Sequence, residues 1–159
     1  MKLRVAGVGA GYFAQFHYEA WKRIEEIELV GVCDLDSEKA EQTALIHNIP
    51  EVCSEFDRLC KKTNPGLVDI ITPPNSHKKL VEKAFRYRIP VICQKPLAPD
   101  LKTANEMVSL AEKNDMFFAV HENFRFQPWF QEIKIILENQ LLGKIYSLSF
   151  RLRPGDGQG

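Results

Sequence analysis

The sequence is poor in cysteine, and none of its four cysteines forms a Cys-x-x-Cys pair. No pair of histidines or cysteines has the ligand spacing of a metal site on a helix or a knuckle. Isolated thiols in apolar segments are typical of a reducing compartment. We therefore expect reduced cysteines, no bound metal and a cytoplasmic location. The cysteines are Cys33, Cys53, Cys60 and Cys93.

The sequence also lacks an excess of charge and any long hydrophobic run. Lysine plus arginine and aspartate plus glutamate each number 21, which gives a formal net charge of zero. This balance predicts neither nucleic acid nor an anionic membrane as a partner. The apolar runs fall far short of the ~20 residues that cross a bilayer, and we expect no secretory signal at the N-terminus.

Over residues 1–122, short apolar runs alternate with stretches in which apolar residues recur at helical spacing. Such alternation predicts βαβ units and a doubly wound parallel sheet, an α/β Rossmann fold with helices on both faces. In this fold, ligands bind beyond the carboxyl ends of the strands. The strand-like runs are 3–8, 28–34, 67–71, 90–94 and 116–120.

Residues 123–159 follow a different pattern. Pro128 opens a helical stretch that we expect to end at Gly143, with its apolar residues facing inward. Residues 146–152 then alternate between apolar and polar side chains, which predicts a strand with one apolar face. We interpret 123–159 as a linker helix and the first strand of a truncated second α/β domain, either missing or completed by another chain. An unpaired strand at 144–152 predicts self-association, so we expect a homo-oligomer.

A glycine-rich loop follows the first strand-like run and can be read in two registers. A motif that starts at Gly7 places the large Tyr12 where close helix packing requires a small residue. The register Gly9-x-Gly11-x-x-Ala14 fits: Gly9 permits the tight turn, Gly11 lets a pyrophosphate approach the backbone, and Ala14 lets the helix pack on the strand. The N-terminus of the following helix would supply N–H donors to the phosphates.

An acidic residue ends the second strand-like run at the spacing that this motif requires. Asp34 lies 20 residues after Ala14, where an acid binds the adenosine ribose hydroxyls (34 − 14 = 20). Its carboxylate repels a 2′-phosphate, and no lysine or arginine follows at 35–37, so NAD is favoured over NADP. Two alternatives stay open here. The loop could be a turn without a ligand, with Asp34 as a helix cap, or the site of an S-adenosylmethionine methyltransferase.

The sequence resembles the glucose–fructose oxidoreductase/inositol dehydrogenase (Gfo/Idh/MocA) family over nearly its whole length. The resemblance implies NAD(P)-dependent oxidation or reduction at a hydroxyl or carbonyl of a sugar, polyol or related substrate. It also implies a second α/β domain that supplies a further catalytic residue. The matching segments, in chain order, are Gly9-x-Gly11-x-x-Ala14 with His17, Asp34, Thr72-Pro73-Pro74-Asn75-Ser76-His77, Gln94-Lys95-Pro96-Leu97, Asn123-Phe124-Arg125-Phe126 and Leu142-Gly143-Lys144-Ile145.

Lys95 matches the lysine of the family's Glu-Lys-Pro motif, which implies a catalytic role beside the nicotinamide. An ammonium group there can hold the substrate oxygen and relay its proton. The other interpretation is a solvated surface lysine. Gln94 departs from the family's glutamate and removes a negative charge next to Lys95. Pro96 follows, and its peptide bond is a candidate for the cis form.

The remaining candidates follow the predicted strands. Asn123 and Arg125 are expected to bind substrate, although Arg125 could instead bridge two domains. The patterns favour structural roles for His17, as a core residue, and for His121, as a strand-end residue. His77 is also more typical of a helix start than of a catalyst, although it belongs to the candidate set. The cofactor-binding candidates are Gly9, Gly11, Tyr12, Phe13, Ala14, Asp34, Thr72, Pro73, Asn75, His77, Gln94 and Lys95.

These features predict the cofactor-binding part of an NAD-dependent oxidoreductase. A second hypothesis is a non-catalytic nucleotide-binding or regulatory module, which Gln94 and the absent second domain favour. A methyltransferase is the third. The chain as given is expected to lack a complete substrate site.

Overall fold

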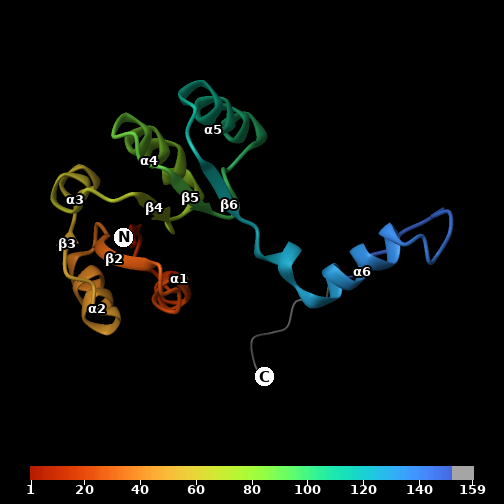
Figure 1. The fold of residues 1–159 in the computed structure, drawn as a ribbon. Helices are drawn as coiled ribbons and strands as arrows, with labels where there is room; N and C mark the ends of the chain where they lie inside the picture. Colours follow the sequence, from red (N-terminus) through yellow and green to blue (C-terminus); the bar gives the residue numbers. More distant parts are fainter. Residues whose placement is uncertain (152–159) are drawn as a thin grey trace. The chain divides into compact units, whose positions relative to one another are not determined.

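A computed structural model describes residues 1–151. Its centre is a six-stranded sheet of parallel strands in the order β3-β2-β1-β4-β5-β6 (Figure 1). The strands are β1 (Leu3–Val8), β2 (Ile27–Cys33), β3 (Val52–Cys53), β4 (Leu67–Ile70), β5 (Val91–Gln94) and β6 (Phe118–His121). The helices are α1 (Ala14–Lys22), α2 (Ser37–His47), α3 (Phe56–Thr63), α4 (Pro74–Arg86), α5 (Leu101–Asn114), the 3-10 turn η1 (Asn123–Phe126) and α6 (Pro128–Glu138).

This strand order confirms the predicted doubly wound Rossmann sheet. The direction of winding reverses between β1 and β4, the two neighbours at the centre of the sheet. Two groups of buried side chains form the core. One includes Tyr18 of α1 and Ala44 of α2, and the other includes Leu59 of α3, Phe85 of α4 and Met107 of α5. The helices therefore pack on the sheet through two separate core clusters, as expected for buried parallel strands.

Short-range signals set several helix ends. Asp36 and Asp100 cap α2 and α5, and each carboxylate accepts a hydrogen bond from the backbone N–H three residues later. Asn48, Asn64 and Asp115 end α2, α3 and α5 in the left-handed conformation, which these residue types tolerate well. One helix begins earlier than expected: α4 starts at Pro74 rather than at His77, because proline is favoured in the first helical turn.

The four cysteines are all buried and free. Burial raises the pKa of the Cys33, Cys60 and Cys93 thiols to about 12, and it raises the pKa of Cys53 as well. Because the thiolate is the reactive form, these side chains behave as small apolar core residues.

The chain divides into two compact units, and the first is Met1–Glu122. In the second unit α6 ends at Glu138 instead of continuing to Gly143, and Gln140 adopts a left-handed φ of 52° just beyond it. Among the apolar residues of this stretch, Phe130 and Ile136 are partly buried, whereas Trp129, Ile133, Leu137 and Leu141 are exposed. The inward apolar face therefore stays a prediction. Among residues 1–151, no helix has the length and apolar character needed to cross a membrane.

The predicted strand at 144–152 does not form over the residues that the structure describes. Residues 145–151 have no regular secondary structure, because a strand requires a paired neighbour for its backbone N–H and C=O groups. The remainder of the expected segment, Leu152 onward, lies outside the described residues. Its interpretation as the start of a second domain stays a prediction.

The buried thiols lead to a first prediction. In native buffer at pH 8, a thiol reagent such as Ellman's reagent should label the chain only as fast as it unfolds, because the thiolates are suppressed and shielded. In urea, all four thiols should react at once. Rapid labelling of the native chain would contradict the buried positions of the cysteines.

Candidate active site

The predicted cofactor-binding residues lie at or just beyond the carboxyl ends of four neighbouring strands. β2, β1, β4 and β5 are adjacent and parallel, so their following loops share one edge of the sheet. The topology therefore brings together the glycine loop, Asp34, the segment after β4 and the segment that contains Lys95. These segments are distant in sequence, and the sheet alone makes them neighbours.

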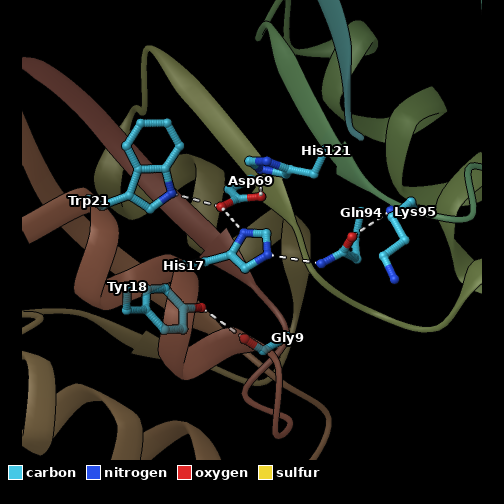
Figure 2. A network of polar contacts seen from close by, with 8 residues as sticks. All are labelled: Gly9, His17, Tyr18, Trp21, Asp69, Gln94, Lys95 and His121. Carbon is cyan, nitrogen blue, oxygen red and sulfur yellow. Dashed lines mark hydrogen bonds and ion pairs between the residues drawn. The ribbon is translucent and has the colours of Figure 1, made fainter. Parts of the chain in front are cut away.

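The glycine loop has one glycine that the fold requires and one that it does not. Gly9 has a φ of 117°, and a Cβ built there would lie 2.8 Å from the Ile71 carbonyl oxygen. Its own carbonyl accepts a hydrogen bond of 2.8 Å from the buried Tyr18 hydroxyl (Figure 2). At Gly11, by contrast, a Cβ would meet no atom within 4 Å. The space in front of Gly11 is open, which fits the approach of a pyrophosphate.

The same geometry decides the register of the motif. A Cβ at Gly7 would lie 2.2 Å from the Tyr18 hydroxyl oxygen, so Gly7 makes room for that ring. Gly7 belongs to helix packing, and Gly9 and Gly11 form the loop. Ala14 is buried at the start of α1 and acts through packing, and no side chain caps this end of the helix. The backbone N–H groups of Ala14 and Phe16 donate to the carbonyl oxygens of Gly11 and Phe13, so an anion would have to bind other N–H groups at this helix start.

Asp34 connects the second strand directly to the loop. Its Oδ2 accepts a 2.7 Å hydrogen bond from the backbone N–H of Ala10, and its Oδ1 accepts one of 2.9 Å from Asp36. The carboxylate is half-buried and each oxygen has a further lone pair for a ribose hydroxyl. The predicted acid and the predicted loop therefore form one unit.

The segment after β4 contains four cofactor-binding candidates, of which three are at least partly exposed and one is buried. Thr72, Pro73 and Asn75 are partly or fully exposed, and Thr72 Oγ1 accepts a hydrogen bond of 2.7 Å from the Ser76 hydroxyl. His77 is also a cofactor-binding candidate, and this role stays a prediction. Its ring is fully buried, with Nε2 2.6 Å from the Thr72 carbonyl oxygen and Nδ1 2.9 Å from that of Leu97. His77 joins the segments that follow β4 and β5.

Lys95 lies directly after β5, and the Lys95–Pro96 peptide bond is cis, as the sequence allowed. Its Nζ lies 5.6 Å from the centroid of the Phe13 ring, within the range of a cation–π interaction. Phe13 belongs to the loop and contacts the exposed rings of Tyr12 and Phe16 edge to face. The lysine ammonium is thus held beside the glycine loop.

Behind Lys95 lies a polar network that the sequence did not predict. Its centre is Asp69 of β4, which is completely buried. Oδ2 accepts hydrogen bonds of 2.9 Å from His17 Nδ1 and 2.7 Å from Trp21 Nε1, and Oδ1 accepts one of 3.2 Å from His121 Nε2 (Figure 2). Burial by itself raises the pKa of the Asp69 carboxyl, but hydrogen bonds from His121 and His17 outweigh it and hold that pKa below its usual value.

Gln94 connects this network to the lysine. Its amide nitrogen lies 2.9 Å from His17 Nε2, and its amide oxygen accepts a 2.6 Å hydrogen bond from the backbone N–H of Lys95. His17, Asp69 and His121 also bring three possible metal-ligand atoms within 4.8 Å of one another. Both histidines hydrogen-bond to the Asp69 carboxylate, so the described contacts explain the cluster without an ion.

Sequence reasoning expected His17 in the core and His121 at a strand end. His121 does end β6, whereas His17 is partly buried and belongs to the polar network instead of the apolar core. Sequence reasoning overlooked Asp69. The available signal was a single acid in the middle of the apolar run Leu67–Ile71, where a buried charge requires partners. Asn123 and Arg125 lie in the second unit, where both are exposed; their predicted role in substrate binding is therefore a proposal.

The family match covers the first compact unit of the chain, Met1–Glu122. The profile of a family described as "Oxidoreductase family, NAD-binding Rossmann fold" (GFO_IDH_MocA) matches residues 3–122. D-apiose dehydrogenase from Rhizobium rhizogenes is 34% identical over 97% of the chain and 45% of its own length. Inositol 2-dehydrogenase 4 from Saccharopolyspora erythraea is 34% identical over 90% of the chain and 43% of its own length.

A solved structure gives the same result. An Agrobacterium radiobacter oxidoreductase, crystallised with NAD+, L-tartaric acid and magnesium, superposes with a TM-score of 0.86. It shares 34% sequence identity and covers 91% of this chain, which in turn covers 42% of it. The chain therefore spans less than half the length of the relatives that it matches.

A second prediction concerns Asp69. The variant Asp69→Asn should lose about 2–4 kcal/mol of unfolding free energy, because its amide N–H₂ opposes groups that are themselves donors. The pKa of Asp69 is lowered in the folded chain, so its contribution is complete above a carboxyl's ordinary pKa of about 4. This contribution is lost as the pH falls through the folded value, and the variant should lack that part of the acid dependence.

Urea unfolding between pH 3 and pH 7 measures both effects. Asp115→Asn is the matched control, because Asp115 is an exposed acid in a left-handed position that asparagine tolerates. Equal unfolding free energies for the two variants would show that the Asp69 network does not stabilise the fold.

Proposed function

The chain belongs to the Gfo/Idh/MocA oxidoreductase family, and on this premise we propose that it is the NAD(H)-binding part of a dehydrogenase. The reaction is hydride transfer at a hydroxyl or carbonyl carbon of a sugar, polyol or related compound. One observation carries the proposal: Lys95 is held against a glycine loop that Asp34 braces, so a proton-transferring group stands beside a dinucleotide site.

The residues present fit NAD(H). The open space at Gly11 admits the pyrophosphate, and the uncapped start of α1 supplies N–H donors to it. Asp34 would bind the adenosine ribose hydroxyls, and its charge disfavours the 2′-phosphate of NADP. Tyr12, Phe13, Thr72, Pro73 and Asn75 would surround the cofactor from the loops that follow β1 and β4.

Bound NAD+ supplies the hydride acceptor for oxidation of an alcohol, and the protein must manage the oxygen and its proton. The ammonium of Lys95 can donate a hydrogen bond to that oxygen and orient the alcohol. In its neutral amine form, the same side chain can accept the released proton and pass it on to solvent, which is general acid–base chemistry. Lys95 is therefore the proposed catalytic residue, with Gln94 directly before it.

The substrate class rests on the relatives, whose names specify apiose and inositol. We place Asn123 and Arg125 among the substrate-binding residues on the basis of the family resemblance. The homo-oligomer and the cytoplasmic location belong to the same proposal. They are supported by the exposed apolar side chains of α6 and by four free thiols.

Gln94 favours a second candidate, a nucleotide-binding module without catalysis. The family's glutamate is replaced by a neutral amide next to the proposed catalytic lysine. Oxidation of a panel of sugars and polyols with NAD+ distinguishes the two functions. The methyltransferase hypothesis is wrong, because the family match assigns the loop to an oxidoreductase.

A third prediction uses the two loop glycines as a matched pair. Gly9→Ala should destabilise the chain by about 1–3 kcal/mol, since an alanine there combines an unfavourable φ with a backbone clash. Gly11→Ala should leave stability within about 0.5 kcal/mol but weaken NADH binding roughly tenfold or more, because its methyl group occupies the pyrophosphate space.

Thermal unfolding and NADH titration measure the two quantities separately. NADH at a hundred times its dissociation constant should raise the unfolding free energy of the unchanged chain by about 2.7 kcal/mol. Unaltered NADH affinity in Gly11→Ala would contradict this location of the pyrophosphate.

A fourth prediction concerns the choice of cofactor. The unchanged chain should bind NADH more tightly than NADPH, and Asp34→Asn should reduce this preference roughly tenfold by removing the charge that repels the 2′-phosphate. The asparagine oxygen can still accept the hydrogen bond from the backbone N–H of Ala10, so the loop should keep its conformation. Glu38→Gln is the control, because it removes an exposed charge from the first turn of α2. An unchanged preference for NADH over NADPH in Asp34→Asn would contradict the proposal that Asp34 binds the adenosine ribose.

A further inference from the structure

The hydrogen-bond network behind Lys95 defines the proton positions on His17. An ionised Asp69 can only accept hydrogen bonds, so the His17 Nδ1 that lies 2.9 Å from Oδ2 must carry a proton. The other ring nitrogen, Nε2, faces the side-chain amide of Gln94 at 2.9 Å. Whether Nε2 carries a second proton depends on which end of that amide it faces.

The backbone of Lys95 fixes the orientation of the amide. A backbone N–H is a donor, so the Gln94 atom 2.6 Å from it is the oxygen Oε1. The N–H₂ group then points at His17 Nε2 and donates to it. A nitrogen that accepts a hydrogen bond has no proton, so this arrangement requires a neutral His17 with its single proton on Nδ1.

We propose that Gln94 and His17 are positioning residues that hold the backbone of Lys95 in place, and that the amide at position 94 keeps His17 neutral. The order of donors is continuous: Lys95 N–H to Gln94, Gln94 N–H to His17, and His17 N–H to Asp69. The catalytic importance of this chain of bonds rests on the proposed function of Lys95. The protonation pattern itself does not.

A glutamate at position 94, as in the family motif, would reverse this requirement. Its carboxylate could still accept from Lys95 N–H but has no proton to give to His17. His17 Nε2 would then have to carry its own proton and become an imidazolium donor. The glutamine therefore changes the charge of the network and not only that of position 94.

The groups that face His17 explain the cost of a second proton there. Asp69 of β4 is the only anion among the described contacts of the ring, and His121 of β6 shares this carboxylate. The two imidazole rings lie 4.4 Å apart between centroids, so two imidazolium groups would repel each other. Trp21 of α1 and Gln94 of β5 are neutral, and Lys95 adds a positive charge next along the chain.

The test is nuclear magnetic resonance of the 159-residue chain with labelled histidine, because only four histidines are present. Long-range proton–nitrogen spectra identify which ring nitrogens are protonated. In the unchanged chain at neutral pH, His17 should show a protonated Nδ1 and an unprotonated Nε2. In Gln94→Glu both nitrogens should be protonated at the same pH. A protonated Nε2 in the unchanged chain, or an unchanged ring in Gln94→Glu, would overturn the proposal.

The positioning of Lys95 is measured in the same samples at one pH. Gln94→Met keeps the side-chain length without the hydrogen bonds, so it should speed hydrogen exchange at the Lys95 backbone N–H roughly fivefold. An unchanged exchange rate at Lys95 in Gln94→Met would refute the positioning role.

NADH titration of each sample separates this inference from the proposed function. The expected protonation pattern without NADH binding would contradict the proposed function alone. NADH binding with the wrong pattern would contradict this inference alone.

Discussion

The hydrogen bonds to the buried carboxylate of Asp69 are the interactions on which the edge of the sheet at the candidate site depends. A charge without solvent is strongly unfavourable unless donors surround it. Here the donors come from α1 and from the end of β6, while Asp69 itself lies at the centre of the sheet on β4. Folding cannot satisfy the carboxylate without docking all three elements. The electrostatic requirement of one residue therefore fixes the first helix relative to the strand ends.

The site is built outward from this rigid centre. His17 and Gln94 carry the network toward the segment after β5, and Tyr18 carries α1 toward the glycine loop through its hydrogen bond to Gly9 (Figure 2). Asp34 braces the opposite side of the loop through Ala10. The loop is thus anchored by side chains on both sides, whereas Gly11 keeps its open space. Preorganisation of this kind reduces the ordering cost of binding a flexible dinucleotide.

Local signals in the sequence were sufficient for the fold class and for the conformation of the glycine loop beside Asp34. The run from Gly9 to Ala14 and the spacing to Asp34 combine turn geometry, helix packing and charge within one βαβ unit, so they could be predicted without contacts. The Asp69 network joins residues 52 positions apart, and no periodicity specifies such a pairing. The burial of His77 was not predicted for a related reason: it depends on carbonyl groups of two separate segments. The strand expected after α6 requires a pairing partner, which alternation of side chains cannot supply.

The contrast between the two loop glycines has an evolutionary consequence. Gly9 is demanded by the packing of the chain against Ile71, so selection for stability alone would preserve it. Gly11 touches nothing that a larger residue would disturb, and glycine carries an entropic disadvantage in the unfolded state. A lineage that had abandoned its nucleotide would be free to replace Gly11 first.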